Sequence, residues 1–181
     1  GTYAVATRAC LLTRLPPDRR DGLARDVERL LRGFHVDVRG WNYRLEETWG
    51  RRDNSLRQFG ALALWDASAA GVPVPERAWL ELDLAFLDAQ RPDGGWNYRE
   101  NDAPARGSMT AAAIATLLVT DDRLAGIRAP GARELAARRR TAIDRGLAWL
   151  DRHFDPARNP GTEKWWFYYA YSIERVGLAT G

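Results

Sequence analysis

The stretch Phe86-Leu-Asp-Ala-Gln-Arg-Pro-Asp-Gly-Gly-Trp-Asn-Tyr-Arg99 predicts the end of a helix, a sharp turn and a tryptophan that closes the turn. Gln90 is its last strong helix former, because Pro92 cannot continue a helix and the following Asp-Gly-Gly supplies turn chemistry. The indole of Trp96 is large enough to cover the helix end. An almost wholly apolar helix is expected next, from Ser108 to Val119.

This unit of helix, Gly-Trp turn and helix occurs more than once. Gly40-Trp-Asn-Tyr-Arg44 returns as Gly95-Trp-Asn-Tyr-Arg99, 55 positions later. The helices behind the two turns align at a spacing of 53, which matches Ser55 to Ser108. A repeat of this length indicates stacked supersecondary units. Two further copies are expected, one near Lys164-Trp165-Trp166 and one at Thr2 to Leu12.

Helices that are apolar on every side alternate with helices that carry only an apolar stripe. The first kind is expected inside the fold and the second outside. The expected inner helices are Thr2–Leu12, the apolar segments ending at Trp65 and Val119, and Trp165–Val176. The expected outer helices are Gly22–Phe34, Glu76–Gln90 and Glu134–Phe154. We therefore predict an all-α fold in one domain, residues 1–181, with about four inner and three outer helices joined as three and a half hairpins.

Local signals suggest how these helices begin. Asp18 or Asp21 is expected to cap the first outer helix, and Asp53 or Asn54 the second inner one. The first inner helix should be buried on most sides, because Thr2 to Leu12 is apolar with little periodicity.

Charge and cysteine content restrict the possible functions. The net charge is +3, and the run Arg138-Arg139-Arg140 is expected on a solvated helix face. Asp121-Asp122 is expected in the turn that ends the third inner helix. No nucleic-acid-binding motif is recognisable. No apolar run is long enough to span a bilayer. The single cysteine, Cys10, excludes an internal disulfide, and no compartment is indicated.

Phe86-Leu87, then Gln90, then Gly95-Trp96 resembles the Gln-Trp repeat of squalene and oxidosqualene cyclases. Related α/α-toroid repeats build the β subunits of protein prenyltransferases. The resemblance covers nearly the whole chain as a repeat pattern and is specific at residues 86–118. It implies a partial α/α toroid, and it implies fold more than activity. Because a complete toroid has more hairpins, we expect a fragment of a larger ring or protein.

The catalytic motifs of these families are missing. Squalene-hopene cyclases carry an Asp-x-Asp-Asp tetrad at an inner-helix start. The equivalent stretches here begin at Asp53 and Arg106, and only Asp53 is acidic. The zinc-binding cysteine of the prenyltransferases is replaced by Asn97, and their histidine by a tyrosine. We therefore expect no metal and no cofactor, and the balance favours a non-catalytic protein. Asp53 and Glu163 are weak candidates for a catalytic acid.

The toroid geometry would gather the turns and inner-helix starts on one aromatic face, which is suited to a cleft. The candidate ligand-binding residues are Trp41, Tyr43, Asn54, Arg57, Gln58, Trp96, Tyr98, Arg106, Trp165, Trp166 and Tyr169. A structural reading competes at several of them: Trp41 and Trp96 as packing staples, and Arg57 with Gln58 as caps of loop carbonyls.

Three functions follow. The first is a non-catalytic repeat module that binds a ligand or partner through this cleft. The second is a divergent cyclase-like or lyase-like enzyme with its acid partly outside the chain. The third is a structural module that self-associates to complete a ring. The expected partners are a small molecule (lipid, sugar or peptide), another protein segment or a second copy, and no nucleic acid.

Overall fold

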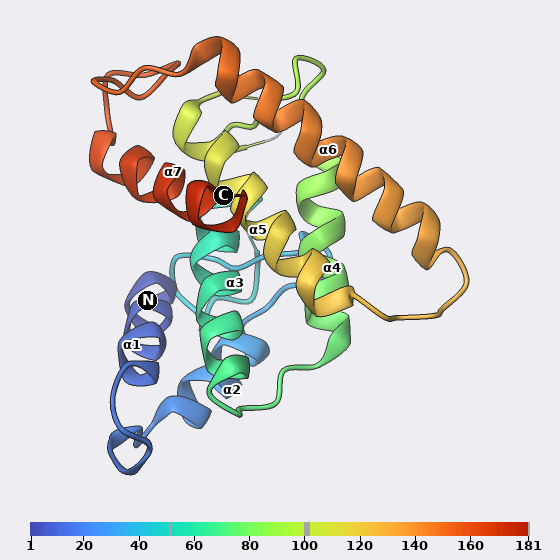
Figure 1. Cartoon of the computed structure of the whole chain (residues 1–181). Coiled ribbons are helices and arrows are strands. Elements are labelled where there is room, and N and C mark those ends of the chain that lie inside the picture. Colours follow the sequence, from blue (N-terminus) through green and yellow to red (C-terminus); the bar gives the residue numbers. More distant parts are fainter. Residues whose placement is uncertain (51, 100–101, 181) are drawn as a thin grey trace. The chain divides into compact units, whose positions relative to one another are not determined.

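The computed structural model describes residues 1–50, 52–99 and 102–180 (Figure 1). Within these ranges the chain is helical and contains no strand, apart from an isolated bridge between His35 and Gly40. The predicted all-α fold is confirmed. The helices are α1 (Thr2–Thr13), a short 3-10 turn η1 (Pro17–Arg19), α2 (Leu23–Arg32), α3 (Asn54–Ala69), α4 (Glu76–Asp88), α5 (Gly107–Leu124), α6 (Ala132–His153) and α7 (Trp166–Thr180).

The chain divides into two compact units, residues 1–85 and 86–181. None of the helices in the described ranges has the length and apolar content that crossing a bilayer requires.

The first unit is built around α3, which packs against both α1 and α2. Its apolar side chains, including Leu56 and Leu64, are buried around most of the helix circumference. By contrast, α2 buries a single stripe that contains Leu23, Val27 and Leu30. The predicted difference between an all-round apolar helix and a striped one is confirmed here. The 3.6-residue period of α2 leaves its Arg and Glu side chains in solvent.

The prediction that α1 is buried on most sides is wrong. Only Thr2, Val5, Ala6 and Ala9 are buried, all on one face, and the opposite face includes Leu11, which is 63% exposed. A composition of small apolar residues shows that a helix can be covered, and neighbouring elements determine how much of it is.

The second unit is built around α5, which packs against α6 and α7. The run Ala111–Leu117 is buried, as predicted for an inner helix. Its core also contains Phe86, Trp96, Ile114 and Trp149. The ring of Trp96 lies so close to α6 that a Cβ added at Gly146 would stand 2.8 Å from its Cζ3 atom. A glycine in α6 therefore admits the indole.

The prediction that α7 is covered on every side is wrong, whereas its place among the inner helices stays a prediction. Tyr169, Ser172 and Val176 are its buried residues, and they form the face that meets α5. The aromatic residues at its start and on its opposite face are exposed. The predicted start also differs by one residue, since Trp165 precedes the helix.

Of the two predicted helix caps, the one at α2 is wrong and the one at α3 is confirmed. The helix α2 follows Gly22, which has φ +92°, and it has no side-chain cap, so neither Asp18 nor Asp21 caps it. Asp53 caps α3 as predicted, by accepting hydrogen bonds from the backbone N–H groups of Ser55 and Leu56.

The charges of α5 and α6 also differ from the expectation. Asp121 and Asp122 lie inside α5, which continues to Leu124, so they do not form the turn. Asp121 instead accepts a hydrogen bond of 2.6 Å from the guanidinium of Arg139 on α6. Arg139 is thereby buried rather than solvated, whereas its neighbours in the arginine run are exposed. Phe154, predicted to end this helix, lies just beyond α6, and its side chain is exposed.

A close contact between Trp41 and Gly60 yields a stability prediction. A Cβ at Gly60 of α3 would lie 2.3 Å from Cζ3 of Trp41, far inside van der Waals contact. We expect Gly60→Ala to reduce the free energy of unfolding by about 1–3 kcal/mol, measured by urea denaturation. The matched control is Gly177→Ala in α7, where nothing lies within 4 Å and alanine should be neutral or stabilising. Equal effects of the two changes would contradict this packing.

Candidate functional site

Two tryptophans close the loops that follow α2 and α4. The indole Nε1 of Trp41 donates to the carbonyl of Leu30 at 2.7 Å, and that of Trp96 donates to the carbonyl of Phe86 at 2.8 Å. Each acceptor belongs to the third residue from the end of its helix, where backbone carbonyls have no partner within the helix. Both indoles are fully buried. The structure supports the reading of these two residues as packing staples.

The asparagine after each tryptophan closes its loop in a repeated way. The Oδ1 atoms of Asn42 and Asn97 each accept from the next backbone N–H at 2.7 Å. The Nδ2 atom of Asn42 donates to the carbonyl of Trp49 at 3.0 Å, and that of Asn97 donates to the carbonyl of Pro104. In both loops the acceptor lies seven residues after the asparagine. We use the term Asn corner for an asparagine whose side chain accepts from a backbone N–H and donates to a later backbone carbonyl of its own loop.

A third Asn corner is centred on Asn159, which sequence reasoning missed. Its Oδ1 accepts from the N–H of Ser108 at 2.9 Å, and its Nδ2 donates to the carbonyl of Lys164 at 3.0 Å. The loop also receives the first N–H of α5, since Gly107 donates to the carbonyl of Pro160 at 2.9 Å. The expected third copy near Lys164-Trp165-Trp166 stays a prediction, and α7 begins there, at Trp166. The sequence signal for this third corner is the asparagine before Pro160-Gly161. The residue before that asparagine is an arginine, where the other two corners have a tryptophan.

The same anchoring occurs in the first unit. The N–H of Thr2 donates to the carbonyl of Tyr43 at 2.8 Å, and the Thr2 hydroxyl donates to the carbonyl of Asn42. The loop after α2 thus holds the start of α1, and the loop after α6 holds the start of α5.

We expect Asn159→Asp to destabilise the protein by about 1–3 kcal/mol, because a buried amide donor becomes an acceptor that faces the Lys164 carbonyl. Thermal unfolding followed by circular dichroism measures the change. The control is Glu163→Gln in the same loop, an exposed position where an effect below about half a kcal/mol is expected. A variant at Asn159 as stable as this control would remove the third corner from the account.

Asp53 lies in a closed network at the start of α3. Its Oδ1 accepts from the hydroxyl of Ser55 at 2.5 Å and from that residue's N–H at 3.0 Å. Its Oδ2 accepts from the hydroxyl of Tyr43 at 3.1 Å. The hydroxyls of Tyr3 and Ser55 lie 2.6 Å apart. A buried carboxylate committed in this way caps the helix, and neither oxygen is presented to a substrate. The other candidate acid, Glu163, is exposed.

Arg57 holds the loop before α3. Its Nε donates to the carbonyl of Arg39 at 3.0 Å and its Nη2 to the carbonyl of Val38 at 2.7 Å. Its Nη1 donates to Oδ1 of Asn54 at 2.8 Å. The predicted alternative, a cap of loop carbonyls, is confirmed for this arginine. Gln58, which follows it, is buried in the same helix turn.

In the second unit, two predicted residues meet directly. The guanidinium carbon of Arg106 lies 5.3 Å from the ring centroid of Tyr98, a cation–π distance. Tyr169 is buried against the start of α5, where a Cβ at Gly107 would approach its Cε2 to 2.8 Å. Burial raises the pKa of the Tyr169 hydroxyl, and the charge of Asp155 acts in the same direction, against the Asp155 backbone N–H.

Burial sorts the predicted ligand-binding residues into groups. Tyr43, Trp165 and Trp166 are exposed, and Tyr98 and Arg106 are half-buried. The buried members are Trp41, Asn54, Arg57, Gln58, Trp96 and Tyr169. The side chains of the buried members are therefore committed to packing within their own units. Exposed aromatic surface is concentrated instead at the start of α7.

Trp165 has a backbone conformation that tryptophan rarely adopts. Its φ is +65°, in the left-handed region that disfavours residues with a Cβ, and its side chain is 61% exposed. Its carbonyl accepts the first helical hydrogen bond of α7, from Tyr169 at 3.0 Å. Trp166 donates to the carbonyl of Pro156 at 3.2 Å, and Phe167 is 84% exposed. A strained backbone and exposed aromatic side chains therefore occur together at the start of α7, in Trp165 to Phe167.

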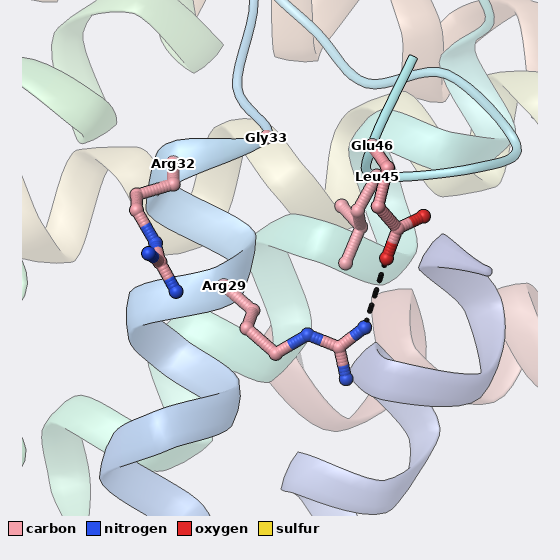
Figure 2. A pocket seen from close by; sticks show the side chains of 5 residues that line it. All are labelled: Arg29, Arg32, Gly33, Leu45 and Glu46. Carbon is pink, nitrogen blue, oxygen red and sulfur yellow. Dashed lines mark hydrogen bonds and ion pairs between the residues drawn. The ribbon is translucent and has the colours of Figure 1, made fainter.

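A shallow pocket of about 330 Å³ lies beside the end of α2 (Figure 2). Its lining residues are Arg29, Arg32, Gly33, Leu45 and Glu46. Arg29 donates to Glu46 at 3.0 Å, and the dashed line of Figure 2 marks this contact. The pKa of Glu46 is lowered by its own backbone N–H and then by Arg29. The pocket contains none of the predicted site residues, and one of its two arginines, Arg29, already has a carboxylate partner.

Comparison of the chain with protein-family models, with curated proteins and with solved structures finds no match. The resemblance to terpene cyclases and prenyltransferases therefore stays a prediction from the repeat pattern. In the part of the chain that the structure describes, no three His, Cys, Asp or Glu side chains gather as a metal would require. The thiol of Cys10 is not primed as a nucleophile, because burial and then Asp66 raise its pKa to about 12.

Proposed function

We propose that this chain is a non-catalytic α/α-toroid-type repeat module that binds a helical protein segment through the exposed face of α7. The observation that carries the proposal is an apolar stripe of Phe167, Tyr171 and Leu178 on the side of α7 opposite its buried face. Spaced by four and then seven residues, these side chains follow the period of one helix face. Phe167 is 84% and Leu178 is 73% exposed. A striped face of this kind suits the groove or face of another helix.

The proposed architecture places α1, α3, α5 and α7 as inner helices and α2, α4 and α6 as outer ones, in a single domain that is part of a larger toroid or protein. Support comes from each unit separately. Successive inner helices pack together in both, α1 with α3 and α5 with α7. In both, an Asn corner after an outer helix anchors an inner helix start.

The state of the candidate acids supports a non-catalytic role. Asp53 is committed to capping α3 and to the hydroxyls around it, and Glu163 stands in solvent. A small-molecule cleft has less support than a docking face, because six of the eleven residues predicted to line it are buried. An exposed stripe on a helix offers an extended contact area that a protein segment can cover. A small ligand needs a concave pocket that encloses it, and a stripe does not provide one.

The proposal predicts binding of a model amphipathic helix. The probe is a tryptophan-free peptide with leucines at positions i, i+4, i+7 and i+11. It is titrated while the tryptophan fluorescence of the protein, to which the exposed Trp165 and Trp166 contribute, is followed. We expect Phe167→Glu to weaken binding at least about tenfold, because a carboxylate would have to be desolvated at the contact. The matched control is Val36→Glu, which introduces the same charge at an exposed apolar residue outside α7.

Two outcomes would contradict this function. One is a peptide that binds the parent protein no better than a sequence-scrambled version of itself. The other is equal binding by Phe167→Glu and Val36→Glu, which would place the contact away from α7.

A further inference from the structure

A second exposed stripe with the same spacing as that of α7 lies on α1. Its members are Ala4, Arg8, Leu11 and Leu15, at positions i, i+4, i+7 and i+11. Leu15 lies just beyond the helix, in a turn where its N–H donates to the carbonyl of Leu12 at 3.1 Å. All four are exposed, and they lie opposite the buried face of α1.

The stripe of α7 repeats this pattern with a charge of opposite sign. Its members are Phe167, Tyr171, Glu174 and Leu178, again at i, i+4, i+7 and i+11. The α1 stripe carries one cation, Arg8, at its second position. The α7 stripe carries one anion, Glu174, at its third.

We propose that α7 of one copy of this chain packs antiparallel against α1 of a second copy. The inference rests on the proposed function and names the partner of that face. The spacing reads the same in both directions, so an antiparallel alignment keeps every position matched. It pairs Ala4 with Leu178, Arg8 with Glu174, Leu11 with Tyr171, and Leu15 with Phe167.

The charge pair selects the antiparallel direction. In the parallel alignment Glu174 would face Leu11, so the carboxylate would lose water without gaining a cation from the second copy. In the antiparallel alignment it faces Arg8. The guanidinium of Arg8 already bonds Asp26, yet its side chain remains 57% exposed and carries further N–H donors. Glu174 bonds the adjacent Arg175 at 3.2 Å, and its side chain is 56% exposed.

The two faces differ from each other, so this contact is heterologous. One copy contributes α1 and the other contributes α7. Such contacts either close into a small ring or continue into a longer assembly. Residue sizes agree with the pairing, because the smallest residue of one stripe meets a leucine and each large side chain meets another apolar one.

Sedimentation velocity of the full chain over a wide concentration range tests the proposal. We expect reversible self-association that Leu11→Glu weakens at least about tenfold, and that Tyr171→Lys weakens similarly. The double variant, with both changes in every copy, should recover most of the lost affinity, because the new charges face each other. The control, Val36→Glu, should associate like the parent.

The outcomes separate this inference from the proposed function. A parent protein that stays monomeric, or a double variant as weak as the sum of its two changes, overturns the antiparallel contact. The model peptide contacts α7 alone, so Leu11→Glu should leave its binding unchanged at protein concentrations where the parent is monomeric. If the peptide binds and the chain does not self-associate, the α7 face stands and its partner is not a second copy. If Leu11→Glu associates like Val36→Glu, α1 is not the surface that α7 meets.

Discussion

A hydrogen bond from a buried indole to the end of the preceding helix fixes the loop after α2 and the loop after α4. An indole N–H that leaves water must find an acceptor, and the last carbonyls of a helix must find donors. Trp41 and Trp96 meet both requirements at once, with Leu30 and Phe86 as acceptors. The bond fixes the chain as it leaves the helix, and the adjacent asparagine then closes the loop. In the first unit the loop so formed offers the carbonyl of Tyr43, which accepts from the N–H of Thr2 at the start of α1. In the second unit the start of α5 is received by the loop of Asn159, which has no tryptophan.

Much of this arrangement could be predicted from the sequence, because it depends on short-range chemistry. The Gly-Trp-Asn repeat, the cap at Asp53 and the alternation of all-round and striped helices in the first unit require only turn geometry, capping and periodicity. The third corner was missed because Arg158 occupies the place of the tryptophan and Asn159 follows Asn97 by 62 positions rather than by the repeat length. A repeat is recognised in the sequence by its conspicuous tryptophan, whereas the residue that closes the loop is the asparagine.

The remaining differences depend on contacts between elements. Arg139 belongs to a run that looks solvated, yet it is buried and its guanidinium bonds Asp121 of another helix. The composition of α7 predicts an inner helix, and its burial is limited to the face that meets α5. Of the predicted site residues, exposure distinguishes Trp165 and Trp166 from buried ones of similar chemistry. No spacing rule contains that information, since it depends on which neighbours cover each side chain.

The uneven burial of the helices relates the fold to the proposed function. In stacked repeats, each unit covers its neighbours, and terminal units stay soluble when their outer faces are polar. The outer faces of α1 and α7 instead carry apolar side chains, with Leu11 and Phe167 exposed. A polar cap is absent from both faces among the residues described, and the two stripes share one spacing with charges of opposite sign. The apolar packing that joins α1 to α3 and α5 to α7 within the units can therefore also act between molecules.

Hydrogen exchange of the indole N–H groups, resolved by nitrogen-15 NMR, tests the central bond most directly. The account predicts that the indole protons of Trp41 and Trp96 exchange only through large-scale opening, since each is buried and bonded to a helix-end carbonyl. The indole proton of Trp165 should exchange quickly, because that side chain is exposed. Exchange of Trp41 and Trp96 at the rate of Trp165 would contradict the account.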